Sequence, residues 1–330
     1  MKLPSKLYRY RPLADGDLVD RELAALQDSY LFSPSFADMN DPMEAFYDTG
    51  GPGDGIVNAM LASAGKRVDD LYNMLSETIG RFALISFAGS HEDLPMWAYY
   101  GSNFAGMCLE FDTAELGIGD FQNEKLRPVT YARDALPPLT LADFGPERLK
   151  DAVIARITRK RSEWAHEKEW RFVTGQVGPK YYLDDALRRV FLGPLVKPEH
   201  AAKVCQALAK RPVEVLRGEI KGFELKFLSI QSARPLDECE RVGSGKFDPT
   251  EDLYAEKELR NFLKVPFEKV IEECRQTARR PNMEQIAGVD LAGSDGQAIY
   301  LWTTYKLRHG REVYNKRYFD ARFRLIRGRP

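Results

Sequence analysis

Short connections between strand-like segments constrain the fold of this 330-residue chain more than any other feature of its sequence. Most of them are too short for the helical crossover that joins neighbouring parallel strands, so a doubly wound sheet is disfavoured. Apolar alternation and apolar runs predict strands at residues 7–11, 30–32, 82–87, 107–111, 129–132, 167–174, 190–192, 213–216 and 223–230. Helices are predicted near residues 19–26, 56–80, 93–100, 146–165 and 198–209. We therefore expect an α+β fold with a mixed, mainly antiparallel sheet core and flanking helices.

A small C-terminal module is expected beyond the segment Gly243-Ser244-Gly245, which reads as a linker. Residues 250–280 show helical apolar spacing, while residues 298–307 and 314–326 read as strands. The sequence therefore predicts two domains, residues 1–240 and residues 247–330.

The end of the chain is strongly basic. Residues 306–330 hold nine Lys and Arg against two Asp and Glu, a local charge of +7 in a chain whose net charge is −1. Tyr314, Tyr318, Phe319 and Phe323 are interleaved with these cations. Such a tail can follow a phosphate backbone while its rings stack on bases, or it can form a half-buried strand pair with a basic outer face.

Apolar patterning and cysteine use favour a soluble cytoplasmic protein. No segment approaches 18 uninterrupted apolar residues, and residues 1–11 lack the apolar region of a secretory signal. The four cysteines form no C-x-x-C pair and the four histidines are scattered, so no metal site is predicted. We expect no membrane partner.

Two carboxylates stand two residues apart at the start of a strand-like apolar run. If this run is a strand, Glu167 and Glu169 share one face while Trp170 and Phe172 point to the other. Paired acids can stabilise the oxocarbenium-like transition state of a reaction at a sugar ring. Arg171 lies on the same face, however, and can instead neutralise Glu169 in an ion pair.

Several short motifs, taken in order, resemble a widespread bacterial family of domains of unknown function. They are Tyr8-Arg9-Tyr10-Arg11, Asn40-Asp41-Pro42-x-Glu44, Ser86-Phe87, Met96-Trp97-Ala98-x-Tyr100 and Glu167-Lys168-Glu169-Trp170-Arg171. The resemblance spans residues 6–230. The chain departs from the usual family pattern at Tyr99, where histidine is common, and in the residues that flank Asn-Asp-Pro.

The order of these parts also resembles the ADP-ribosyltransferase superfamily, in which an Arg or His on the first strand, a Ser or Thr on a middle strand and a late Glu surround NAD. The resemblance implies that Arg11, Ser86 and the Glu167-x-Glu169 pair occupy these three positions. It implies an ADP-ribosyltransferase-like fold, NAD as co-substrate, and a nucleic acid or a protein as acceptor. A toxin or antiviral phage-defence setting fits such an activity, and the resemblance leaves room for a regulatory partner.

The charged candidates have defined roles in this chemistry. Glu169 would hold a ribose hydroxyl and stabilise positive charge, and Glu167 would position or deprotonate the nucleophile. Arg11, together with Arg9, can clamp the pyrophosphate, or both can lie on a solvated strand edge.

The remaining candidates have a functional and a structural interpretation. Trp97 and Tyr100 stand at helical spacing and can stack on nicotinamide or a base, or belong to the core. Asn40, Asp41 and Glu44 suit either a functional loop or an ordinary turn.

Two other functions stay open at this point. A metal-dependent nuclease can bind Mg²⁺ through converging acids, here Asp38, Asp41, Glu44, Glu167 and Glu169. Alternatively, the chain can be a non-enzymatic module that binds nucleic acid or a partner through its basic tail.

Overall fold

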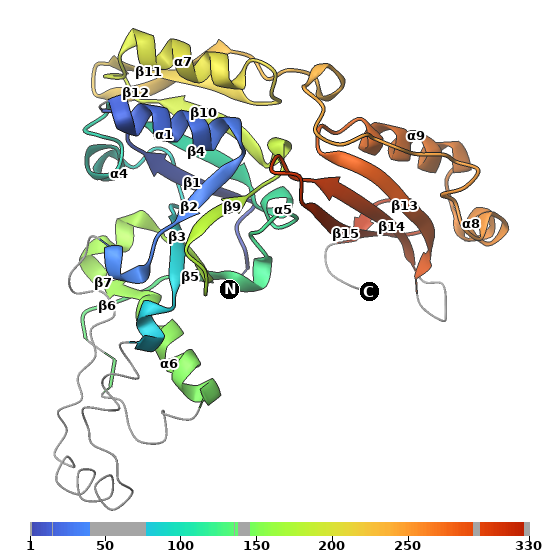
Figure 1. Cartoon of the computed structure of the whole chain (residues 1–330), viewed down its shortest axis with the longest axis horizontal. Helices are drawn as coiled ribbons and strands as arrows, with labels where there is room; N and C mark the ends of the chain where they lie inside the picture. Colours follow the sequence, from blue (N-terminus) through green and yellow to red (C-terminus); the bar gives the residue numbers. More distant parts are fainter. Residues whose placement is uncertain are drawn as a thin grey trace, which may run out of the picture.

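The computed structural model describes residues 2–14, 16–39, 77–134, 136–137, 146–292 and 298–326. Within them, helices flank five sheets whose strands run mostly antiparallel, so the predicted α+β class is confirmed (Figure 1). No helix in these ranges is long and apolar enough to cross a membrane. The helix predicted at 56–80 lies outside the described residues except for its last turn.

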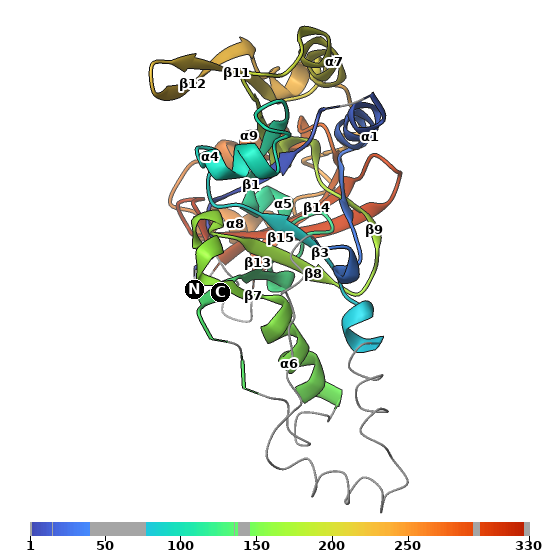
Figure 2. The same cartoon turned by 90° about the vertical axis from the view of Figure 1, so that its left-hand side faces the viewer.

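The central sheet has the strand order β1-β4-β10-β11-β12. Its strands are β1 (Lys6–Arg11), β4 (Met107–Asp112), β10 (Leu187–Leu192), β11 (Glu214–Lys221) and β12 (Glu224–Gln231). Among these neighbours only β10 and β11 are parallel, and helix α7 (Pro198–Leu208) connects them. Helix α7 packs on α1 (Gly16–Gln27), while the β11–β12 hairpin projects from the far end of the sheet (Figure 2).

A three-stranded sheet, ordered β3-β8-β5, lies beside β1. The backbones of Tyr8 on β1 and Ala88 just after β3 exchange two hydrogen bonds of 3.0 and 2.7 Å, which fixes the two sheets against each other. The strands are β3 (Ala83–Phe87), β5 (Leu126–Pro128) and β8 (Trp170–Thr174). Two short pairs accompany them, β2 (Tyr30–Ser33) with β9 (Gly178–Tyr181), and β6 (Thr130–Ala132) with β7 (Arg159–Arg161).

Short helices fill the connections of this part of the chain. The α-helices are α4 (Leu94–Tyr99), α5 (Thr113–Leu116) and α6 (Pro146–Ile157). The 3-10 helices are η1 (Phe36–Asp38), η2 (Asn123–Lys125), η4 (Ser162–Glu167), η5 (Asp184–Ala186) and η6 (Leu236–Glu238). Helix α4 begins at an N-cap, where the Asp93 carboxylate accepts a hydrogen bond from the Met96 amide at 3.1 Å.

The chain between α6 and β8 differs from the sequence prediction. Helix α6 ends at Ile157, where the Thr158 hydroxyl donates to the carbonyl of Ile154 at 2.7 Å, and the basic run that follows pairs with β6 as strand β7. After η4, Lys168 adopts a left-handed conformation with φ of 45°. The predicted strand over residues 167–174 therefore begins only at Trp170, because Lys168 interrupts the extended backbone.

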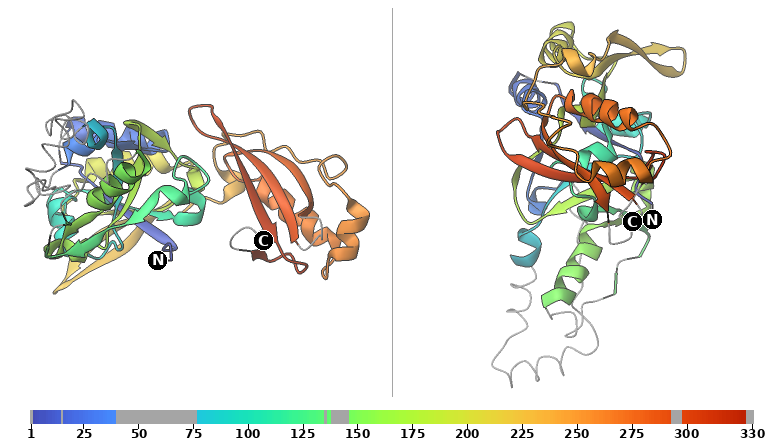
Figure 3. Two further views of the ribbon diagram at one scale, coloured as in Figure 1. Left: turned by 90° about the horizontal axis from the view of Figure 1, so that it is seen from below. Right: turned by 90° about the vertical axis from the view of Figure 1, so that its right-hand side faces the viewer.

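The C-terminal module is an antiparallel sheet, ordered β13-β14-β15-β16, with two helices beside it (Figure 3). Its elements are α8 (Glu256–Phe262), α9 (Phe267–Ala278), β13 (Met283–Ala292), β14 (Ala298–Lys306), β15 (Glu312–Phe319) and β16 (Leu325–Ile326). The segment read as a linker lies against the start of β13. The amide of Gly245 donates to the Met283 carbonyl at 2.9 Å, and a Cβ on Gly243 would stand 2.1 Å from the same oxygen.

Buried ion pairs join this module to the preceding chain. Arg280 Nε lies 2.7 Å from a carboxylate oxygen of Asp185, and Arg308 Nη2 lies 2.6 Å from Asp184. Two further pairs cross the junction, Arg317–Glu115 and Arg311–Asp120. Acids of the preceding chain thus match three of the nine cations of the tail, Arg308, Arg311 and Arg317, which favours the strand-pair interpretation of the tail. The division into domains 1–240 and 247–330 stays a prediction.

Candidate functional site

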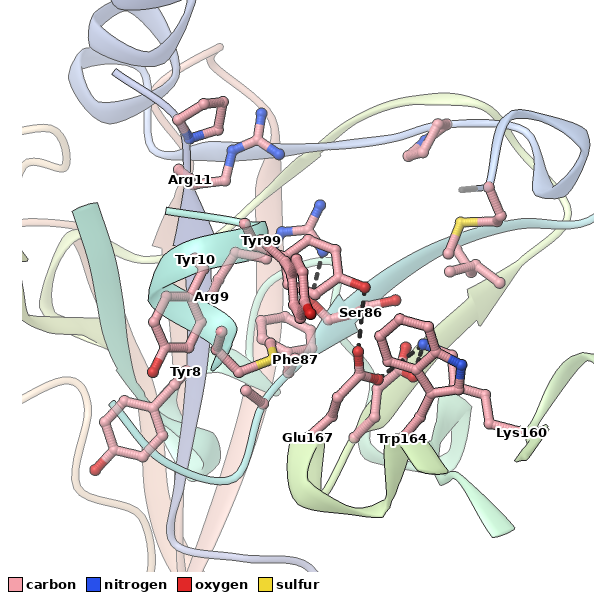
Figure 4. A pocket seen from close by; sticks show the side chains of 18 of the residues that line it. Tyr8, Arg9, Tyr10, Arg11, Ser86, Phe87, Tyr99, Lys160, Trp164 and Glu167 are labelled. Carbon is pink, nitrogen blue, oxygen red and sulfur yellow. Dashed lines mark hydrogen bonds and ion pairs between the residues drawn. The ribbon is translucent and has the colours of Figure 1, made fainter. Parts of the chain in front are cut away.

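A cavity of about 570 Å³ is walled by β1, β3, α4 and the segment from β7 through η4 (Figure 4). Six of the predicted site residues line it, namely Arg9, Arg11, Ser86, Tyr100, Glu167 and Glu169. Trp97 and Arg171 do not line the cavity. Lys160 and Trp164 do, and the sequence prediction misses both because it extends helix α6 through them.

Lys160 holds the two acids of the pair together. Its ammonium nitrogen lies 2.8 Å from Glu167 Oε2 and 2.9 Å from Glu169 Oε2. The three side chains are only 6%, 2% and 3% exposed, so the contacts are shielded from bulk water. The acids converge as predicted, but through the turn at Lys168 and this shared cation rather than through a common strand face.

Glu169 is neutralised by Arg171, as the structural interpretation of the pair predicts. Arg171 Nε donates to Oε1 of Glu169 at 2.8 Å and Nη2 donates to Oε2 at 3.1 Å, a bidentate arrangement. Arg171 is fully buried and also donates to the Ile157 carbonyl at 2.5 Å. Both oxygens of Glu169 are thus committed to protein cations, which leaves Glu167 as the acid better placed to meet a ligand.

The pKa values of the two carboxyl groups are shifted in opposite directions. Burial raises the pKa of the Glu167 carboxyl above its ordinary value, although Lys160 opposes that shift. Burial acts on Glu169 in the same sense, but Arg171 and Lys160 outweigh it and lower the pKa of Glu169 to about 2. Of the two acids, Glu167 is therefore the one that burial makes easier to protonate.

The arginines of β1 reach the cavity from the other wall (Figure 4). Arg11 is held by Glu22 of α1, whose carboxylate accepts from Arg11 Nε at 2.7 Å. Arg9 Nη1 donates to the Ser86 carbonyl at 2.5 Å, and its Nε is buried without a hydrogen-bond partner in the described chain. Burial and the charge of Arg11 lower the pKa of the Arg9 guanidinium to about 9. Arg9 therefore does not lie on a solvated strand edge, and its guanidinium has no anionic partner within the described chain.

Ser86 contributes a second unsatisfied group. Its hydroxyl oxygen helps to stabilise the charge of Glu169, yet it makes no hydrogen bond of normal geometry with any described residue. Buried polar atoms without partners are rare in folded proteins and are commonly explained by a ligand or water. The side of the cavity formed by β1 and β3 is therefore built to meet a polar molecule.

The aromatic candidates separate into core and cavity residues. Trp97 is fully buried, and its indole nitrogen donates to the His91 carbonyl at 2.7 Å, so its predicted role of stacking on a ligand is wrong and its core interpretation is right. Tyr100 lines the cavity and donates from its hydroxyl to Glu167 Oε1 at 3.1 Å. Tyr99 and Trp164 also line the cavity, with ring centroids 6.3 Å apart.

The predicted loop residues Asn40, Asp41 and Glu44 lie outside the described part of the chain. Asp38 lies inside it and lines the cavity. Across the described ranges, no group of three or more His, Cys, Asp or Glu side chains is arranged to hold a metal ion.

Sequence comparison shows that part of the cavity is formed by a segment similar to a known protein family. Residues 96–172 match the model of a family described as "Protein of unknown function (DUF2971)". This DUF2971 segment carries Tyr100, Lys160, Glu167 and Glu169, whereas the arginines come from the chain before it. No curated protein and no solved structure matches the chain. Similarity to a family of unknown function is thus supported for this segment, and the ADP-ribosyltransferase resemblance stays a prediction.

Proposed function

We propose that the chain is an NAD-consuming, ADP-ribosyltransferase-like protein that modifies a nucleic acid or a protein. The proposal rests on the arrangement of a single cavity. One wall presents the guanidinium of Arg9, whose Nε has no hydrogen-bond partner in the described chain, and the other wall presents the carboxylate of Glu167. Its volume of about 570 Å³ lies within the range of small-molecule and cofactor sites. A ligand with a central anion and a ribose fits these two groups.

In the proposed reaction, the residues of each cavity wall have a distinct role. Arg9 and Arg11 would contact the pyrophosphate, and Glu167 takes the place first predicted for Glu169, since Glu169 is occupied by Arg171 and Lys160. The bond between the ribose C1′ and nicotinamide breaks, and nicotinamide leaves with the bonding electron pair. A lone pair of the acceptor forms the new bond to C1′, and Glu167 accepts the proton that the acceptor loses.

Nicotinamide release from NAD tests the proposal. Glu167→Gln should lower the rate by about 100-fold or more, because the variant cannot accept the proton and carries no charge. The matched control is Glu163→Gln, an exposed acid on the same 3-10 helix, which should release nicotinamide at the wild-type rate. No release by the wild type, with DNA, RNA and protein each offered as acceptor, would refute the proposal.

A non-enzymatic binding module is the second candidate. It is favoured by the observation that each carboxylate oxygen of Glu167 and Glu169 already accepts a hydrogen bond or ion pair within the protein. This alternative predicts that the chain binds nucleic acid or a partner and leaves NAD intact, without any release of nicotinamide.

A further inference from the structure

The acid pair is closed to a cationic acceptor. A guanidinium acceptor, such as a protein arginine, would add a positive charge to two carboxylates that Lys160 and Arg171 already balance, whereas a neutral acceptor needs only one further hydrogen bond to Glu167. Displacing Lys160 would leave the buried carboxylates of Glu167 and Glu169 without the cation that they share, which is strongly unfavourable. The sequence leaves the acceptor open, and this geometry disfavours arginine.

The net charge of the site disfavours a cation as well. Lys160 and Arg171 balance Glu167 and Glu169, so this part of the site is neutral. On the opposite wall, Arg11 is balanced by Glu22, while Arg9 has no ion-pair partner in the described chain. The two acids therefore offer no unbalanced negative charge to a cationic acceptor.

An aromatic pair stands at the mouth of the same cavity. Tyr99, at the end of α4, is 69% exposed although it is a large ring, and Trp164 of η4 lies beside it with an interplanar angle of 70°. Both rings line the same cavity as Glu167 (Figure 4). An exposed ring and a half-buried ring beside a polar site suit a flat, neutral ligand that stacks on one ring and meets the edge of the other.

We infer that the acceptor is an unpaired base of a single-stranded nucleic acid, held against Tyr99 and Trp164 with its nucleophilic nitrogen turned toward Glu167. The inference rests on the proposed function for its chemistry, but base recognition can be measured without turnover. A base in a duplex is stacked on both faces, so the aromatic pair can reach only a base that has left the stack. The inference assigns no role to the three tail arginines at the junction, because acids of the preceding chain pair with them.

Binding of fluorescent single-stranded DNA and RNA oligonucleotides to the full chain tests this inference. Stacking on an aromatic side chain is typically worth enough that Tyr99→Ala and Trp164→Ala should each weaken binding by about 5-fold to 100-fold. The matched control is Tyr314→Ala, a 66% exposed tyrosine on β15 of the basic tail, which should bind as the wild type does. The same oligonucleotide in duplex form should bind more weakly than the single strand.

Labelled NAD supplies the second readout. Transfer of label to oligonucleotides but not to agmatine, a small guanidinium acceptor, would support the inference. Labelling of agmatine, equal losses in Tyr314→Ala, or a raised KM for NAD in Tyr99→Ala and Trp164→Ala with unchanged oligonucleotide binding would each overturn it. If oligonucleotide binding depends on the two rings while no nicotinamide is released, the proposed transferase function fails and base recognition stands.

Discussion

Replacing Lys160 by methionine removes the ammonium that two buried carboxylates share. Methionine keeps the length of the side chain and its packing near Trp164, so the change is mainly one of charge. Removing one partner of a buried pair destabilises a protein by about 3 to 5 kcal/mol. Glu169 keeps the bidentate contact with Arg171, so Glu167 bears most of the loss and we expect the lower end, about 3 kcal/mol. With an unfolding entropy of about 2.1 cal/mol/K per residue, that corresponds to a melting temperature lower by roughly 4 °C for 330 residues.

Thermal unfolding at pH 7 measures this effect, with Lys203→Met as control. Lys203 makes an exposed contact of 3.8 Å with Asp20, and its loss should move the melting temperature by about 2 °C or less. The double variant Lys160→Met/Glu167→Gln should regain most of the lost stability, because no unpaired carboxylate remains. Lowering the pH from 7 should also narrow the difference in melting temperature between Lys160→Met and the wild type as Glu167, whose pKa is raised by burial, becomes protonated. A Lys160→Met protein that melts with the wild type, or one that Glu167→Gln does not rescue, would refute the electrostatic account of the site.

Three further perturbations test other parts of the structure. Glu22→Gln should release Arg11 from its ion pair and lower the KM for NAD several-fold in the nicotinamide assay; an unchanged or higher KM would count against a role for Arg11 in anion binding. Arg280→Met should lower the free energy of unfolding by about 3 to 5 kcal/mol in urea, because Asp185 stays buried without its partner; a loss below 1 kcal/mol would contradict this. The carboxyl pKa of Glu169 is about 2 in the folded chain and is ordinary when unfolded, so the unfolded state binds more protons between these values. Stability should therefore fall as the pH drops from about 4.5 to 2, and Glu169→Gln should show a shallower decline in the same urea titrations.

Much of the site could be predicted from local sequence patterns, because the periodicity of a strand or helix decides which of its residues share a face. Strand alternation places Arg9 and Arg11 on one face of β1, and that face does reach the cavity. Helical spacing places Trp97 and Tyr100 near each other, but only packing decides that the indole is enclosed while the phenol meets Glu167. The sequence offers no sign of which ring enters the core.

Lys160 shows why the remainder could not be predicted. In the sequence it stands within a basic run that reads as the solvated end of a helix, and nothing local marks it as buried. Its position depends on the end of α6 at Ile157 and on the pairing of β7 with β6, a contact between segments about 29 residues apart. The left-handed turn at Lys168 then brings both acids to the same ammonium.

The sequence by itself determined the α+β class, most of the strands and most of the charged residues that line the cavity, with Lys160 as the exception. These depend on short-range periodicity and on turn chemistry, which neighbouring residues encode directly. Only the tertiary structure decided that Glu169 is neutralised, that Glu167 faces the cavity, and that the basic tail is matched by acids across the junction. Ion pairing and burial depend on which distant segments contact one another. The charge state of each side chain therefore depends on these tertiary contacts and not on its sequence neighbours.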